Sequence, residues 1–238
     1  MKRYFIRVPI LIFFILLFSC VTTNSLIRNH FRSLEESDDV TVVLLGSSLF
    51  GRKWTTDKGL SYGGFLKSHL EDILKSQISI INSSVPYDTF NSTRLRLQED
   101  ILSYRPDIVF LILGVIDSSR PGLTKETYRQ QVNEFLNILQ KHKVFVVVMT
   151  SFGSRDLLSG FGSGAERLGE FNEIIQREAG LHRYPFIDVG EYMERLRTNN
   201  NKKFRSMFSN EYQLNENGQK FVLEFILKRI KKAVKNSG

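Results

Sequence analysis

Cysteine is scarce in this sequence: Cys20 is the only one among 238 residues. A single cysteine excludes an internal disulfide and any CxxC redox or metal motif. The sequence also lacks a glycine-rich phosphate loop and a cluster of residues with metal-ligand spacing, so we expect no cofactor and no metal. Its basic residues do not interleave with aromatic ones, which argues against a nucleic-acid partner.

The composition is that of an ordinary globular protein. Hydrophobic residues make up 42% of the chain and charged residues 24%, and the length favours a single domain with a sizeable core. The formal net charge is +8. This excess indicates a weak preference for acidic surfaces, such as anionic lipid or polymer.

The N-terminus has the pattern of a secretory signal. Met1–Arg7 holds three basic residues and no acid, and an apolar run over Val8–Phe18 follows. The run ends in Leu17–Cys20 (LFSC), which resembles the lipobox of bacterial lipoproteins. The resemblance implies a signal peptide over residues 1–19, lipidation at Cys20, and a domain held by lipid on a bacterial membrane, outside the cytoplasm. The alternative is an uncleaved signal anchor, because no charge occurs from Val8 to Ile27.

Residues 20–39 are polar without a firm period and are predicted to be a tether, followed by one domain over residues 40–238. Amphipathic helical patterns over Tyr62–Leu74, Tyr128–Leu139 and Asn215–Lys235 alternate with buried-strand patterns. This alternation predicts an α/β fold, a three-layer α/β/α sandwich around a parallel sheet. The five expected strands are Val40–Leu45, Ile78–Ile81, Asp107–Leu113, Val144–Met149 and Tyr184–Asp188.

A serine follows the first expected strand, in the segment Gly46–Leu49 (GSSL). The carboxyl end of a strand in a parallel sheet is where such folds present their functional groups. A serine hydroxyl is a poor nucleophile unless a neighbouring base takes its proton. The role of Ser48 therefore depends on finding that base.

Four segments, each after an expected element, resemble the SGNH or GDSL-type hydrolase family. They are Gly46–Leu49, Asn82–Thr89, Gly114–Asp117 and Asn210–Asn215. The block order, together with the strand and helix alternation, predicts a five-stranded sheet in the order 2-1-3-4-5. The resemblance implies site positions at Ser48 (nucleophile), Tyr87 (oxyanion-hole glycine), Ile116 (oxyanion-hole asparagine), Asn210 (acid) and Gln213 (base).

Only the serine retains the residue type that the family has at these positions. The amide of Gln213 does not titrate near neutral pH, so it cannot take the Ser48 proton and return it. Asn210 carries no charge to stabilise an imidazolium, and Ile116 has no donor for an oxyanion. Tyr87 keeps a backbone N–H, but its ring could fill the space that a glycine leaves open.

None of the four histidines is placed to replace the missing base. His142 and His182 precede the fourth and fifth strands, at the amino ends and opposite Ser48. His69 lies in the middle of a helix, and His30 lies in the expected tether.

Three interpretations remain open. The first is a degenerate SGNH-fold lipoprotein that binds an envelope acyl or glycan ligand, or a protein partner, without turnover. The second is an active serine ester hydrolase or acyltransferase on lipid or cell-envelope acyl groups. The third is a structural envelope protein, since fold does not imply function. Without a base, the alternative for Ser48 is a turn residue that satisfies backbone at the strand end. Asp88 and Asp117 could be catalytic carboxylates, but the pattern favours residues that fix a loop by hydrogen-bonding backbone.

Overall fold

The structure, a computed structural model, describes residues 23–46, 62–153, 155, 162–210 and 213–235. Within these residues one parallel sheet has the order β2-β1-β3-β4-β5, so the predicted order is confirmed. The strands are β1 (Asp39–Gly46), β2 (Gln77–Asn82), β3 (Ile108–Ile112), β4 (Phe145–Met149) and β5 (Phe186–Ile187).

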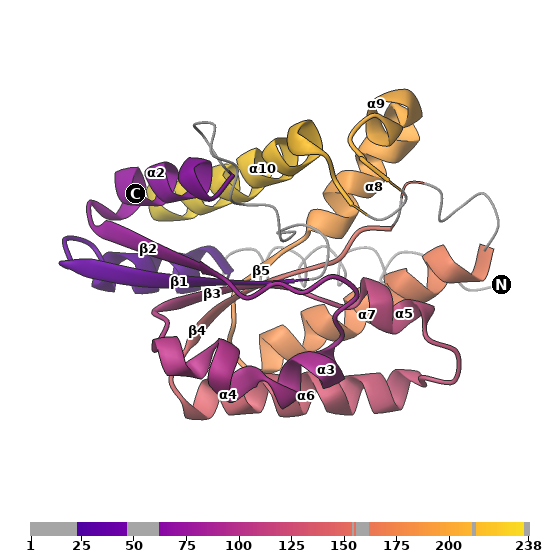
Figure 1. Ribbon diagram of the computed structural model, residues 1–238, viewed down its shortest axis with the longest axis horizontal. Coiled ribbons are helices and arrows are strands. Elements are labelled where there is room, and N and C mark those ends of the chain that lie inside the picture. The colour runs from indigo at the N-terminus through magenta and orange to yellow at the C-terminus, as the bar shows by residue number, and fades with distance from the viewer. Residues whose placement is uncertain (1–22, 47–61, 154, 156–161, 211–212, 236–238) are drawn as a thin grey trace, which may run out of the picture.

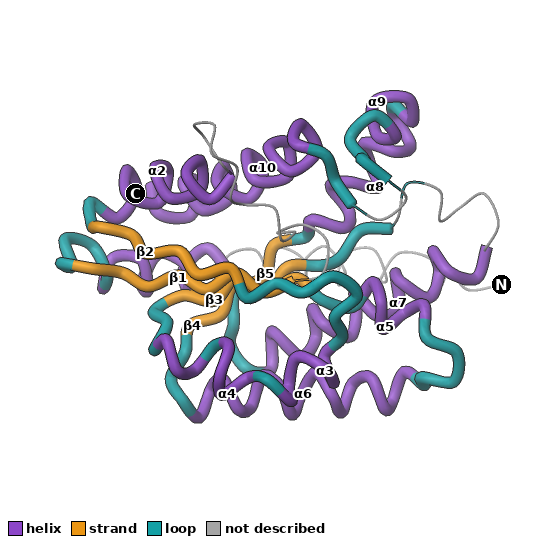
Figure 2. Tube along the Cα trace, viewed as in Figure 1, coloured by secondary structure: helices purple, strands orange, loops and turns teal. Residues whose placement is uncertain are grey.

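Helices cover both faces of the sheet, which gives the predicted three layers (Figures 1 and 2). One face packs against a helix over residues 23–33 and against α2 (Tyr62–Leu74), α8 (Val189–Asn199), α9 (Asn201–Arg205) and α10 (Glu216–Lys235). The other packs against α3 (Phe90–Leu95), α4 (Leu97–Asp100), the 3-10 helix η1 (Leu102–Tyr104), α6 (Lys125–Lys141) and α7 (Gly162–Leu181). The short α5 (Val115–Ser119) contacts α7.

The sequence of β1 explains why both faces must be covered. Val42 and Leu44 point into one core and Val43 and Leu45 into the other, and all four are fully buried. Side chains alternate between the faces of a strand, so an uninterrupted apolar run has to be shielded on both sides.

Part of the expected tether is a packed helix instead. Residues 23–33 are helical, and Ile27 and Phe31, four residues apart on one face, are each 1% exposed in the core. The Arg28 Nε also donates a hydrogen bond to the carbonyl of Ala233, near the end of α10. The sequence pattern missed this helix because its apolar positions are few and polar residues surround them.

One other boundary differs from the sequence prediction. The fifth strand is shorter than expected, because Asp188 caps α8 by accepting a hydrogen bond from the Glu191 N–H. Among the described residues, no helix combines the length and the apolar character needed to cross a bilayer.

Candidate functional site

The carboxyl edge of the sheet collects the loops that carry the predicted site positions. β1 ends at Gly46, two residues before Ser48 in the sequence. The predicted nucleophile Ser48 and the predicted lipidation site Cys20 lie outside the described residues. Tyr87, Ile116, Asn210 and Gln213 are described.

The loop after β2 is fastened to the end of β1. The Ser83 N–H and the Ser84 hydroxyl both donate to the carbonyl of Leu44, at 3.0 and 3.3 Å. Tyr87 has a φ of +63°, in the left-handed region that favours glycine. This backbone geometry fits a position where the family has glycine. The Tyr87 side chain is 65% exposed, so its ring is not enclosed by the loop.

Asp88 holds the next part of this loop through its side chain. The carboxylate is buried and accepts hydrogen bonds from the Ser92 and Thr93 hydroxyls, at 2.6 and 2.7 Å. The Arg96 guanidinium completes the set with an ion pair. Thr89 then caps α3 by accepting from the Ser92 N–H. A carboxylate bound by three donors anchors the loop, but the predicted backbone partners are wrong, because these donors are side chains.

Asp117 joins the loop after β3 to the start of α3. One carboxyl oxygen accepts a hydrogen bond from the Phe90 N–H at 3.3 Å, which confirms that this residue fixes a loop. The other oxygen and the nearby buried Tyr128 hydroxyl have no partner among the described residues. Burial raises the pKa of Asp117 to about 7, and the Phe90 hydrogen bond offsets part of that effect.

Gly114 allows this loop to pass close to α6 and α7. Its φ is +116°, and a Cβ there would lie 2.7 Å from the Tyr128 hydroxyl and 3.0 Å from Cδ1 of Ile175. Two residues on, Ile116 is half-buried in α5. Its aliphatic side chain presents no hydrogen-bond donor at this position.

Asn210 and Gln213 bond to each other. The Gln213 N–H donates to Oδ1 of Asn210 at 2.9 Å, and Nδ2 of Asn210 donates to Oε1 of Gln213 at 3.1 Å. The structure thus brings together the two residues at the expected acid and base positions. Both are amides that neither gain nor lose a proton near neutral pH, so the pair cannot transfer one.

Packing places the Asn210–Gln213 loop at the carboxyl edge. An antiparallel bridge between Phe208 and Leu214 closes the loop, and Phe208 meets the ring of Phe152 at 6.4 Å between centroids. Phe152 follows β4 by three residues. Gly218 allows the start of α10 to pack closely against the loop. A Cβ at this position would lie only 2.2 Å from the Met207 carbonyl oxygen, so a larger residue would not fit.

All four histidines of the chain are described, and none lies at this edge. Nε2 of His30 is 3.0 Å from the Asp107 carbonyl, before β3, and its ring stacks on Phe145. His142 and His182 precede β4 and β5, and His69 lies within α2. Burial lowers the pKa of both His30 and His182. The expectation that no histidine stands near the end of β1 holds for these positions.

A cavity of about 460 Å³ opens beside the ends of β4 and β5, between α7 and α8. Its floor is rigid: the Thr150 hydroxyl donates to Asp188 and accepts from the Gly190 N–H, and Asn172 exchanges two hydrogen bonds with the Ser151 backbone. The lining mixes carboxylates and amides with apolar groups: Leu168, Asn172, Glu173, Gln176, Glu191, Met193, Glu194, Arg197, Phe152 and Phe204.

The residue patterns used to predict the site did not indicate this cavity. It borders the loop that carries Phe152, yet none of the described site positions lines it. The available signal was the polar residues that directly follow two buried strands, Thr150 and Ser151 after β4 and Asp188 after β5. No group of three or more histidines, cysteines and carboxylates among the described residues could hold a metal ion.

The family follows from comparison with known proteins. A model of the family described as "GDSL-like Lipase/Acylhydrolase family" matches residues 44–221. The chain belongs to this family. The matched range contains Ser48 and all four of the other predicted site positions.

Individual relatives are more distant. The Bacillus subtilis (strain 168) protein named uncharacterized lipoprotein YqeF is 24% identical over 111 residues, 42% of this chain and 46% of that protein. The match thus spans about half the length of this curated relative. A lipase/acylhydrolase from Enterococcus faecalis is similar in structure, with a TM-score of 0.65 and 21% identity over 84% of this chain and 99% of that one.

An acetyl xylan esterase from Geobacillus stearothermophilus gives a TM-score of 0.67 and 13% identity, covering 80% of this chain and 94% of that one. At these identities, the two structural likenesses show a shared SGNH-hydrolase fold.

Proposed function

We propose that this GDSL-family protein is a lipid-anchored lipoprotein of the cell envelope that binds an acyl or glycan ligand at the carboxyl edge without turnover. The observation that supports the proposal is the Asn210–Gln213 pair: the residues that the family resemblance assigns to the acid and base positions are two mutually bonded amides. Ser48 then has no group at these positions to accept its proton.

The magnitudes favour binding over catalysis. A positioned general base contributes about 10²–10⁴ to a rate. A single oxyanion-hole donor contributes about 10²–10³. Gln213 lacks the first function and Ile116 lacks the second, so turnover by this chain should be close to the uncatalysed background.

The cavity supports a ligand rich in hydroxyl groups. Its carboxylates and amides, such as Glu173, Asn172 and Gln176, accept or donate hydrogen bonds, while Phe152 and Leu168 supply apolar surface. This combination suits an acylated sugar, and acetyl xylan esterases are among the structural neighbours. An acetylated xylo-oligosaccharide is therefore a reasonable first probe.

The cavity's role is tested by calorimetric titration of the full chain with that oligosaccharide. We expect binding that Glu173→Gln with Gln176→Ala weakens. Glu166→Gln, a change on the same helix outside the cavity lining, should leave binding unchanged. Equal affinity of all three proteins would remove the cavity from the proposal.

The lipid anchor is supported by the N-terminal sequence pattern and by the lipoprotein name of the Bacillus subtilis relative. Several acyl chains anchor a protein stably, whereas a single chain binds a membrane only marginally. Metabolic labelling with a fatty acid should mark the wild-type chain and not Cys20→Ala. Equal label in both would refute lipidation at Cys20.

The alternative function is an active ester hydrolase or acyltransferase. Family membership and the esterase neighbours favour it. It requires a base outside the family's usual position, and Ser48-dependent turnover by the wild-type chain would establish it.

A further inference from the structure

The amino edge of the sheet presents a row of basic residues. Arg105, Lys143 and Arg183 stand two or three residues before β3, β4 and β5, which are neighbours in the sheet. All three are exposed and left-handed, with φ of 49°, 57° and 56°. Residues other than glycine, asparagine and aspartate are strained in this conformation. Each turn thus carries a long cation where a small residue would be less strained.

Exposed apolar side chains stand in the same turns. Tyr104 is 46% exposed beside Arg105, and Leu181 is 67% exposed just before Arg183. These are two of the four large hydrophobic residues exposed within the described part of the chain. We define the amino-edge patch as these two residues and four cations, namely Tyr104, Arg105, Lys141, Lys143, Leu181 and Arg183.

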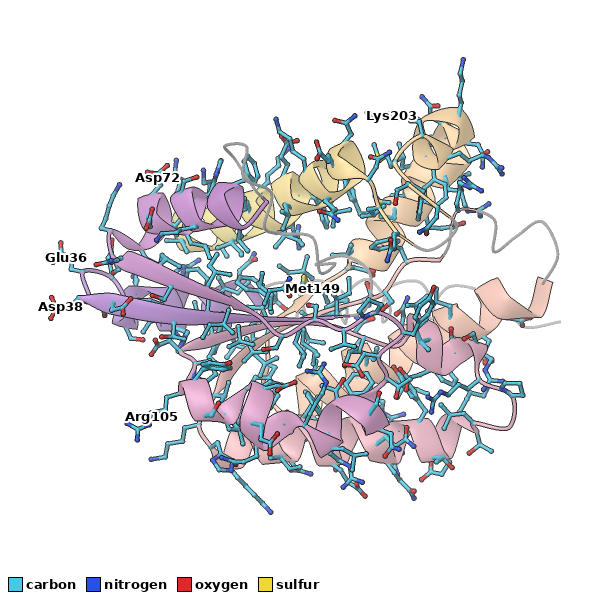
Figure 3. All side chains as sticks on the ribbon, viewed as in Figure 1. Glu36, Asp38, Asp72, Arg105, Met149 and Lys203 are labelled. Carbon is cyan, nitrogen blue, oxygen red and sulfur yellow. The ribbon has the colours of Figure 1, made fainter. Side chains whose placement is uncertain are left out.

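The cations of this patch form no salt bridge with the part of the chain that the structure describes. The Asp107 carboxylate nearby accepts a hydrogen bond from the Thr41 N–H at 2.8 Å. Glu36 and Asp38, just before β1, lie at the same end of the molecule as Arg105, whose side chain points outward from the fold (Figure 3).

The last turns of the helix over residues 23–33 lie at the same edge. His30 contacts the Asp107 carbonyl and stacks on Phe145 at 3.8 Å, at the beginnings of β3 and β4. The helix over residues 23–33 is about 16 Å long at 1.5 Å per residue, and Cys20 precedes it by three residues. His30 is seven residues, or about 10 Å of helix, from residue 23, so a lipid on Cys20 would hold the bilayer within roughly 20 Å of the amino edge.

We propose that the amino-edge patch docks on an anionic lipid bilayer. Exposed Tyr and Leu side chains suit the interface between headgroups and acyl chains, and Lys and Arg side chains are attracted to anionic headgroups. The docked domain presents its carboxyl edge, with the cavity, away from the bilayer by roughly the 26 Å length of β1. The ligand that binds in the cavity would then be a group on an envelope polymer, and not a lipid of the bilayer beneath the domain. This inference rests on the lipid anchor of the proposed function.

The test is hydrogen exchange of the full chain reconstituted into vesicles of phosphatidylcholine alone or with one third phosphatidylglycerol. We expect slower exchange over residues 103–106, 141–144 and 181–184 in the anionic vesicles, and no change over 188–197. Each basic side chain near an anionic surface shifts the docked-to-free ratio about fivefold, so removing three lowers it about a hundredfold. The triple variant Arg105→Asn, Lys143→Asn, Arg183→Asn should abolish the protection.

The matched control removes the same charge from α9, with Lys202→Gln, Lys203→Gln and Arg205→Gln, and should keep the protection. Figure 3 shows Lys203 at the opposite end of the molecule from Arg105. Asparagine is tolerated in the left-handed region, so the first variant should fold as well as the parent. Equal exchange in both vesicles, protection over 188–197 instead, or protection only on adding another protein would overturn the proposal. Fatty-acid labelling of Cys20 is measured separately, so a failure to dock is distinguishable from a missing anchor.

Discussion

At the carboxyl edge of the sheet, glycine stands where the backbone packs too closely for a side chain, whereas at the amino edge basic residues occupy left-handed turns that would suit glycine. A Cβ at Gly190 would lie 2.5 Å from the Ser151 carbonyl oxygen. Lys143 and Arg183 hold positive φ values in open, exposed turns. The first edge is constrained by packing, and the second is free to vary its side chains.

This contrast bears on what each edge does. The loops of the carboxyl edge are held by Asp88 and Asp117, and the residues predicted at the acid and base positions, Asn210 and Gln213, are amides bonded to each other. Among the described residues no side-chain hydrogen bond holds Arg105 or Lys143, and both side chains are exposed. If both proposals hold, the carboxyl edge acts through its loop geometry and the amino edge through its charge.

Restoring the carboxyl edge should give the largest effect. We expect Asn210→Asp, Gln213→His and Ile116→Asn together to raise p-nitrophenyl acetate hydrolysis at least about a thousandfold over wild type, since a base and an oxyanion donor are both returned. Gln213→His alone should fail, because the imidazole would lack its orienting carboxylate. Adding Ser48→Ala should abolish the gain. If the triple variant stays inactive, the residue assignments at this edge are wrong.

The buried Asp117 makes the stability of the carboxyl edge depend on pH. Its folded pKa of about 7 lies above the unfolded value of 3.8, so the folded state binds the proton more tightly. This tighter proton binding adds at most about 4 kcal/mol to the free energy of unfolding. The contribution is fully present below pH 4 and is lost as the pH rises through 7. Asp117→Asn should remove this loss of stability. Urea unfolding of both proteins at pH 5 and pH 8 measures the change in the free energy of unfolding between the two pH values. An unchanged difference between the two pH values would contradict the assignment.

The close approach at Gly190 is the next target. Gly190→Ala should destabilise the domain by about 1–3 kcal/mol, because the new Cβ meets backbone that cannot move aside easily. Gly169→Ala on α7 is the matched control: nothing lies within 4 Å of its Cβ position, and alanine is the better helix former, so stability should hold or rise. Equal urea midpoints for the two variants would show that the close backbone contact at Gly190 does not constrain the carboxyl edge.

The smallest effect is expected at the amino edge. Lys143→Asn should stabilise the domain by up to about 1 kcal/mol, because asparagine relieves left-handed strain. Lys141→Asn, in the last turn of α6, should instead cost a few tenths of a kcal/mol through lower helix propensity. Thermal unfolding of both variants compares them, and a loss of stability at Lys143 would mean that its side chain makes a contact needed by the fold.

The sequence predicted the strands and their order because each strand is an apolar run between helices of clear period, as in β1 and α6. It also placed Asn210 and Gln213 together, since the family resemblance fixed their spacing. It missed the helix over residues 23–33, where Ile27 and Phe31 alone mark the buried face. The cavity depends on how α7 and α8 pack against each other, which local sequence patterns do not encode. The exposure of Leu181 likewise depends on the folded structure and cannot be predicted from its local sequence.

We expect the wild-type chain to have no serine-dependent turnover. The most direct measurement compares p-nitrophenyl acetate hydrolysis by the wild-type full chain with that by Ser48→Ala at pH 8. The Asn210–Gln213 amide pair predicts equal rates, both near the uncatalysed background. A wild-type rate well above background that Ser48→Ala abolishes would contradict the account, since a base would then serve Ser48 from another position.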